Sequence, residues 1–250
     1  MSIGMYYLAK REIMRFLKII NETIFPSIIS SLLFLAIFHF VIGKSTNGSD
    51  YLQFLVPGLT IMNMINNSFI NSAFSVFISK FTHHFEHILT MPLSYLELTT
   101  AYVSGSVARG FLTGISVLIA TSFFVSFTIH NIFILVLYGL FATILFGSIG
   151  VLVALMAKQF DHLGVFNTFF LTPLTMLGGV FYSIKVLPPL FQKLVLFNPL
   201  FYLVDGFRYG LLGISDAPLV QGMIISLILS VGFFSLVVYL MKKGYKVKEW

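Results

Sequence analysis

The segment SKFTHHFEHILTMPLSYLE, residues 79–97, gathers the side chains best suited to metal chemistry, with three histidines within five positions. In a helix, His83 and His87 would lie one turn apart and could share one ion. A catalytic zinc needs a third protein ligand and an open position, and the H-E-x-x-H pattern is absent. The segment therefore favours a short amphipathic surface helix that ends before Pro92 and that a protein partner can bind.

A second candidate for chemistry is GKST, residues 43–46, which resembles the end of a phosphate-binding P-loop. The glycine that this motif requires five positions earlier is Phe38, and the stretch follows an apolar run instead of a β-strand. The match is therefore interpreted as accidental. Because the sequence also lacks cysteine, a Ser-His-Asp set and paired intramembrane carboxylates, it predicts no catalytic residue, no metal and no cofactor of its own.

The composition determines which elements can position these side chains. The 250 residues are 58% hydrophobic and 10% charged, whereas soluble domains are about 25% charged. Long apolar runs without charge predict a polytopic, all-α integral membrane protein. The net charge of +6 is interpreted as a sign of topology and lipid contact, and no nucleic-acid partner is predicted.

Six spans and one interfacial helix are predicted within a single membrane domain, residues 1–250. A basic amphipathic helix at 5–18 is too polar to span and should lie in the membrane interface, although a charged tail without a role remains an alternative. Its apolar face is predicted to carry Met5, Leu8, Ala9, Ile13, Phe16 and Leu17, and its other face Lys10, Arg11, Arg15 and Lys18. The even number of spans puts both termini on the side richer in Lys and Arg, which predicts cytoplasmic termini. The predicted spans are 25–42, 52–79, 98–128, 132–157, 163–181 and 220–240.

The segment between the last two spans fits neither a span nor a solvated loop. A Pro-Pro pair can open one short helix, and an Asn-Pro pair can stop it and open a second. Neither helix would cross about 30 Å of hydrocarbon, so a re-entrant hairpin at 183–212 is predicted. An acidic and a basic residue at i, i+3 on its second helix could pair. The residues assigned to this hairpin are Pro188, Pro189, Asn198, Pro199, Asp205 and Arg208.

Polar residues inside the predicted spans leave two interpretations open. Asn63, Asn67 and Asn71 recur at steps of four on one face of the second span, where they could join helices or line a substrate path. Arg109 lies well inside the third span, so it could face a cavity or partner, or extend towards the head groups.

These motifs in this order resemble the ABC-2 type transporter permeases, in particular the YadH-type permeases of the bacterial inner membrane. YLQFLVPGLTIMNMINNSF resembles the second span of the family, and FEHILTMPLSYLE resembles its cytoplasmic segment, in which Glu86 precedes Pro92. TPLTMLGGVFYSIKVLPPLFQKLVLFNPLFYLVDGFRYG, residues 172–210, resembles the family signature before the last span.

The resemblance implies a homodimeric exporter subunit whose ATP and magnesium are bound by a separate ABC ATPase, in two copies. It implies that residues 80–94 form the coupling helix and its flanks, and that the N-terminal helix also contacts the ATPase. The substrate would be amphipathic: a lipid, a glycan-lipid or a drug-like molecule. The implied coupling residues are Phe81, Phe85, Glu86, Leu89 and Pro92, and the interface-helix residues are Lys10, Arg11, Arg15 and Phe16.

The residues also bear on three other functions. A secondary transporter would show inverted repeats or intramembrane acidic residues, and a membrane enzyme would need a catalytic constellation; neither feature occurs in the sequence. A membrane assembly or regulatory subunit without transport remains an alternative.

Overall fold

The computed structural model describes residues 3–42 and 48–244, and every regular element within these ranges is a helix. The predicted all-α class is therefore confirmed. The GKST stretch at 43–46 lies outside the described residues.

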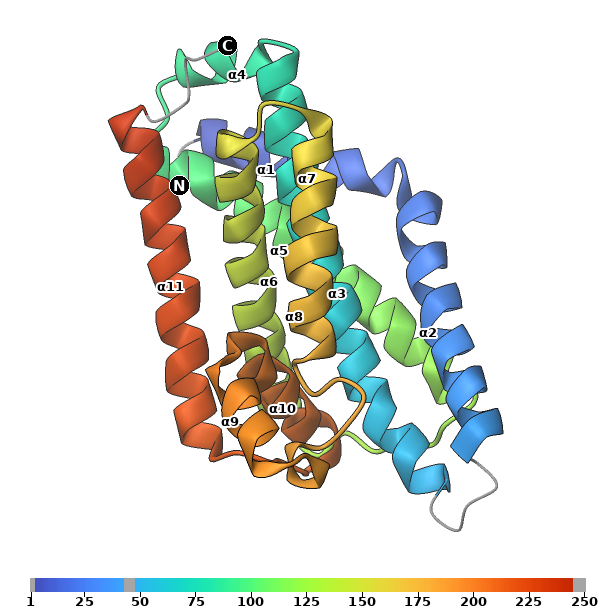
Figure 1. The fold of residues 1–250 in the computed structure, drawn as a ribbon. Helices are drawn as coiled ribbons and strands as arrows, with labels where there is room; N and C mark the ends of the chain where they lie inside the picture. The colour runs from blue at the N-terminus through green and yellow to red at the C-terminus, as the bar shows by residue number, and fades with distance from the viewer. Residues whose placement is uncertain (1–2, 43–47, 245–250) are drawn as a thin grey trace.

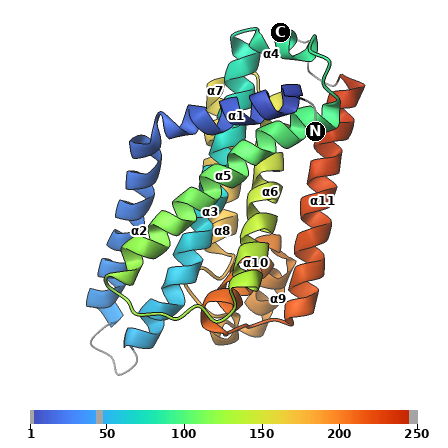
Figure 2. The same ribbon diagram turned by 180° about the vertical axis from the view of Figure 1, so that it is seen from behind.

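Five long helices form a bundle in which α3 and α6 pack together at the centre and α5 crosses them obliquely (Figures 1 and 2). The close approach of α6 to α3 requires Gly150, because a Cβ there would lie 2.6 Å from the carbonyl oxygen of Phe69. The long helices are α2 (Ile20–Ile42), α3 (Gly48–Phe81), α5 (Tyr95–Ser122), α6 (Ile132–Met156) and α11 (Leu219–Lys243).

Shorter helices cover the two ends of this bundle. At one end, called here the α1 end, α1 (Ile3–Leu17) lies across the long helices near α4 (His84–Leu89) (Figure 1). At the other end, the α10 end, lie α9 (Pro189–Phe197) and α10 (Pro199–Leu212), preceded by the short η2 (Ile184–Val186). A helical column made of α7 (Phe160–Phe166), η1 (Asn167–Leu171) and α8 (Thr172–Met176) runs between the two ends.

Within the described residues, four helices are long and apolar enough to cross a membrane: α2, α5, α6 and α11. The predicted second span, α3, has 34 residues, but its asparagines and serines lower its hydropathy. The predicted fifth span is divided by the π-helical turn η1. These four helices indicate a multi-pass helical protein.

Two predicted spans extend beyond the helices that the structure contains. The third span was predicted to reach residue 128, but α5 ends at Ser122, where an aromatic and β-branched run of low helix propensity begins. The fifth was predicted to reach residue 181, but α8 ends at Met176, shortly before the pair Gly178-Gly179. Gly179 adopts a φ of 76°, which a helix cannot continue through.

Candidate functional site

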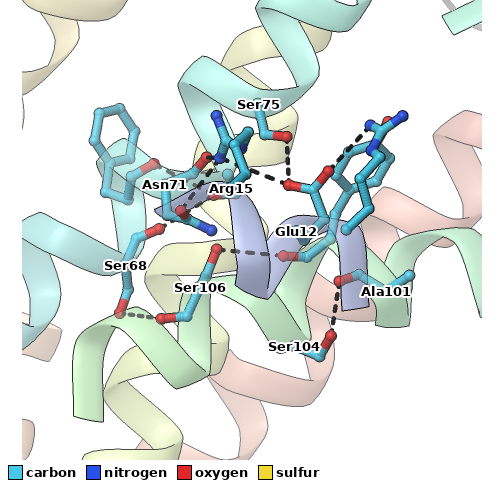
Figure 3. A network of polar contacts seen from close by, with 12 residues as sticks. Glu12, Arg15, Ser68, Asn71, Ser75, Ala101, Ser104 and Ser106 are labelled. Atoms are coloured by element: carbon cyan, nitrogen blue, oxygen red, sulfur yellow. Dashed lines mark hydrogen bonds and ion pairs between the residues drawn. The ribbon is translucent and has the colours of Figure 1, made fainter. Parts of the chain in front are cut away.

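A buried carboxylate, Glu12, lies at the centre of a polar network at the α1 end (Figure 3). It accepts a hydrogen bond from the hydroxyl of Ser75 on α3. Its two oxygens also pair with Nη2 of Arg11 at 3.1 Å and with Nη2 of Arg15 at 3.6 Å. Gly105 of α5 permits this packing, because a Cβ there would lie 2.8 Å from Cβ of Glu12. The network therefore joins α1 to both α3 and α5.

Arg15 extends the network along α3 (Figure 3). Its Nη2 donates to the backbone oxygen of Asn71 at 2.9 Å and to Oδ1 of the same residue at 3.2 Å. Partial burial lowers the pKa of the Arg15 guanidinium below its ordinary value, and the nearby Glu12 carboxylate opposes that shift. The guanidinium and the carboxylate thus compensate each other's loss of water.

The side chains that α1 buries differ from those that its amphipathic pattern predicts. Ile13 and Leu17 were expected on the apolar face, yet the buried residue at this position of the face is the acidic Glu12, and Leu17 is exposed. Arg15 was expected on the solvent face, whereas it turns towards Asn71. This face of α1 can be buried because the charge of Glu12 is paired with those of Arg11 and Arg15. The buried face consists of Met5, Leu8, Glu12 and Phe16, while Lys10 and Arg11 are exposed.

The asparagines of α3 bind the helices that precede it in the chain. Nδ2 of Asn63 donates to Ser31 of α2 at 2.9 Å, and Nδ2 of Asn67 donates to Ser27 of α2 at 3.0 Å. These contacts join α3 to α2. We call the row of α3 residues Asn63, Asn67, Asn71 and Ser75, which binds first α2 and then α1, the polar seam.

Arg109 of α5 joins the polar seam from the other side. Its Nε donates to Oδ1 of Asn67 at 3.3 Å, so Asn67 bridges α2 and α5 across α3. The intramembrane guanidinium therefore has a polar partner in a neighbouring helix.

Lys80, at the end of α3, is a buried cation that the sequence analysis did not single out. Its Nζ donates to the carbonyl oxygens of Leu155 at 2.9 Å and Ala154 at 3.3 Å, in the last turn of α6. The last carbonyls of a helix have no partner within the helix and carry partial negative charge. Lys80 therefore caps α6 and fixes its end against α3.

Replacing Lys80 with methionine is expected to destabilise the protein by about 1–2 kcal/mol, because two carbonyl groups of α6 lose a charged donor while the apolar stem is kept. The measurement is the midpoint of thermal unfolding of the purified protein in detergent. Lys80→Arg should recover part of the loss, and Lys10→Met, an exposed lysine on α1, is the control. Equal midpoints for Lys80→Met and the control would refute the capping role.

The predicted coupling segment forms α4, which is anchored by its apolar face. Phe85 and Ile88 are buried, and the ring of Phe85 lies 6.4 Å from that of Tyr102 on α5. His83 adopts a φ of 58° in the turn from α3 into α4, a conformation that histidine tolerates better than most residues. One histidine of the cluster thus shapes the turn.

The other polar side chains of this segment face outward. Glu86, His84 and His87 are exposed, and the imidazole centroids of the two histidines lie 6.4 Å apart. Phe81 is 59% exposed, although its ring lies 5.6 Å from that of Phe160, and Pro92 is exposed. The side chain of Leu89 lies outside what the structure describes. Among the described residues, no group of three or more His, Asp or Glu side chains could hold a metal ion.

The α10 end is organised around two buried charges, Asp205 and Arg208, which the structure brings together as predicted. Nη1 of Arg208 lies 3.9 Å from Oδ1 of Asp205, and its Nη2 donates a 2.5 Å hydrogen bond to the carbonyl oxygen of Gly179. The guanidinium carbon lies 3.8 Å from the ring centroid of Phe54 on α3. Arg208 therefore joins α10, α3 and the turn after α8.

The Asp205 carboxylate binds the segment that leads into α11. It accepts hydrogen bonds from Oγ of Ser215 at 2.7 Å and from the backbone N–H groups of Asp216 at 2.8 Å and Ala217 at 3.1 Å. A second carboxylate, Asp216, pairs with Nζ of Lys185 at 3.2 Å. Two carboxylates thus fix the approach to α11.

The proline and asparagine residues of the hairpin lie where the pattern predicts. Pro189 and Pro199 are the first residues of α9 and α10, and Pro188 directly precedes α9. Oδ1 of Asn198 accepts from the backbone N–H of Leu200 at 3.1 Å and caps α10.

Comparison with known proteins agrees with this architecture. The model of the ABC-2 type transporter family matches residues 4–212, a region that contains the polar seam, α4 and the Asp205–Arg208 pair. The chain is 40% identical over 237 residues to the inner membrane transport permease YadH of Escherichia coli strain K12, covering 94% of this chain and 93% of that protein.

More distant relatives carry another name. The chain is 27% identical over 173 residues to nodulation protein J of Sinorhizobium fredii, covering 66% of this chain and 64% of that protein. It is 23% identical over 180 residues to nodulation protein J of Rhizobium meliloti, covering 70% and 66%. Since the family model spans more than half of the chain, this protein belongs to the ABC-2 type transporter family.

Proposed function

We propose that the chain is the permease subunit of an ATP-binding cassette exporter in the bacterial inner membrane. It would move an amphipathic substrate, such as a lipid, a glycan-lipid or a drug-like molecule. Family membership and the 40% identity to an inner membrane transport permease support this proposal. ATP and magnesium would be bound by a separate ABC ATPase, in two copies on a homodimer of this chain.

The proposed topology has six spans, with α3 and the α7–η1–α8 column added to the four apolar helices. At about 1.5 Å per residue, the 34 residues of α3 extend about 50 Å, well beyond the ~30 Å of a hydrocarbon core. Its polar side chains do not oppose insertion, because Asn63, Asn67 and Asn71 are buried against other helices. The α1 end would face the cytoplasm with both termini.

The observation that carries the proposed coupling is the way α4 is held. Its apolar face is fixed to α5 through Phe85 and Tyr102, and the chain enters it directly from α3. Its other face, with Glu86, is exposed. A displacement of α4 by a partner bound to this exposed face would move α3 and α5 together. The hydrogen bond from Lys80 to Leu155 would transmit the displacement from α3 to α6.

The α9–α10 hairpin is proposed as a re-entrant element at the outer side, where it would close the exit. Both helices are short, and α9 exposes Leu190, Phe191, Leu194 and Phe197. Exposed apolar side chains on a helix too short to span fit the outer leaflet of a membrane.

The test is ATP hydrolysis by a candidate ATPase co-purified with this chain in lipid, compared with the ATPase alone. We expect a stable complex whose hydrolysis rate differs from that of the free ATPase. Glu86→Ala is expected to reduce this difference severalfold while membrane levels stay unchanged. Asp161→Ala, which removes an exposed carboxylate from the first turn of α7, is the matched control.

The outcomes separate the possible functions. Failure of any ABC ATPase to bind would overturn the exporter proposal. Binding without any change in hydrolysis would favour an assembly or regulatory subunit. If Glu86→Ala and Asp161→Ala changed the rate of ATP hydrolysis equally, the proposal that α4 is the coupling element would be wrong.

A further inference from the structure

A cleft with a volume of about 360 Å³ opens between α1 and α3 at the α1 end. Its α1 wall carries three cationic residues at i, i+4 and i+7, and its α3 wall carries three hydroxyl residues at the same spacing. Spacings of four and three place side chains on one face of a helix, so the two rows face each other. The lining residues are Arg11, Met14 and Arg15 from α1 and Lys18 directly after it, Ser75, Ile78, Ser79 and Thr82 from the α3 side, and His84.

The cleft carries an excess of positive charge. No Asp or Glu is among its lining residues, and the nearest carboxylate of the network, Glu12, pairs with two of the three cations. Lys18 makes no salt bridge within residues 3–42 and 48–244. Nε of Arg15 is buried without a hydrogen-bond partner in the same ranges. The cleft therefore offers the ammonium group of Lys18 to an anion, and the buried Nε of Arg15 is a guanidinium donor without a partner beside it.

The position of the cleft along the chain places it at the surface of the membrane. Lys18 lies two residues before α2, whose residues Ile20–Val41 are apolar and long enough to span. The lining residues on the α3 side lie in and just after its last two turns, where α3 would extend beyond the hydrocarbon core. The neighbouring α1 surface exposes Tyr6 and Tyr7, and tyrosine is enriched at the level of lipid head groups.

We propose that this cleft binds the phosphate of an anionic phospholipid head group. Arg11, Arg15 and Lys18 would neutralise the phosphate, and the apolar Met14 and Ile78 would contact the glycerol and the first acyl carbons. A free phosphate ion shares the charge but has no apolar part for these two residues to contact. The site is independent of ATP and of a transported substrate, so it does not depend on the proposed export function.

The experiment measures binding to the purified full chain in detergent by native mass spectrometry. Dihexanoyl phosphatidylglycerol is compared with dihexanoyl phosphatidylcholine, which has the same chains but no net charge, and with inorganic phosphate. We expect phosphatidylglycerol to bind most tightly. Lys18→Gln should weaken its binding about fivefold, the effect of one interfacial charge, and Lys18→Arg should restore it.

Lys10→Gln is the matched control, because Lys10 is an exposed cation of the same helix that does not line the cleft. It should leave the affinity unchanged. Equal weakening by Lys10→Gln and Lys18→Gln would mean diffuse attraction and overturn the site. Equal binding of the two phospholipids would also overturn it. Inorganic phosphate binding as tightly as phosphatidylglycerol would overturn the lipid assignment in favour of a soluble anion.

Discussion

Replacing Glu12 with alanine is expected to destabilise the protein by about 2 kcal/mol and to loosen α1 from the bundle. The carboxylate is fully buried, and its loss leaves the Ser75 hydroxyl without its acceptor and the Arg15 guanidinium without its paired charge. Breaking a fully buried ion pair costs about 3–5 kcal/mol, and the cost is smaller here because Arg11 and Arg15 keep part of their exposure to water. The measurement is thermal unfolding in detergent, combined with the rate of proteolysis within α1.

Two further variants separate charge from packing at this position. Glu12→Gln keeps the shape and an acceptor for Ser75, so it should recover part of the stability. In a double-mutant cycle with Arg15→Gln, the two losses should not add, because both residues belong to one network. Strictly additive losses would show that Glu12 and Arg15 contribute independently.

Replacing Asp205 with alanine is expected to disrupt the α10 end, with a loss of about 3–4 kcal/mol. The carboxylate accepts three hydrogen bonds from the segment before α11 and faces Arg208, whose side chain is 1% exposed. Its removal leaves a buried, uncompensated guanidinium. The measurements are the midpoint of thermal unfolding and the protease sensitivity of residues 183–218.

The matched control is Asp216→Ala, which removes the neighbouring carboxylate. Its pairing partner Lys185 is 67% exposed, so the stranded cation can be solvated and the loss should be smaller. Asp205→Asn should lie between the two variants, because it keeps one acceptor but no charge. Equal losses for Asp205→Ala and Asp216→Ala would refute the central role of Asp205.

The sequence predicts the elements of this fold well, because their signals are local. Apolar runs identify α2, α6 and α11, and the pairs Pro188-Pro189 and Asn198-Pro199 mark the starts of α9 and α10. The end of α5 was misplaced because the run after Ser122 is as apolar as a span, and hydropathy alone does not record its weak helix propensity.

The site was predicted less completely, because burial of a charge depends on contacts distant in sequence. Glu12 follows Leu8 by four positions and precedes Phe16 by four, so it occupies a regular place on a buried face. The carboxylate is stabilised there by a hydrogen bond from Ser75, a residue of α3, and Gly105 of α5 leaves the space that it needs. Lys80 likewise acquires its role from the end of α6, a structure formed by residues some seventy positions later.

The polar seam has a consequence for the order in which the protein is assembled during synthesis. α2 leaves the ribosome before α3. Two of its hydroxyl groups do not need α3 as a partner, because Thr23 donates to the carbonyl oxygen of Ile19, directly before α2, and Ser27 donates to that of Thr23. Asn63 and Asn67 then arrive with α3 and donate to serines that are already in place. In the proposed six-span topology, hydrogen bonds between helices form after insertion, so these two contacts would fix the position of α3 along α2.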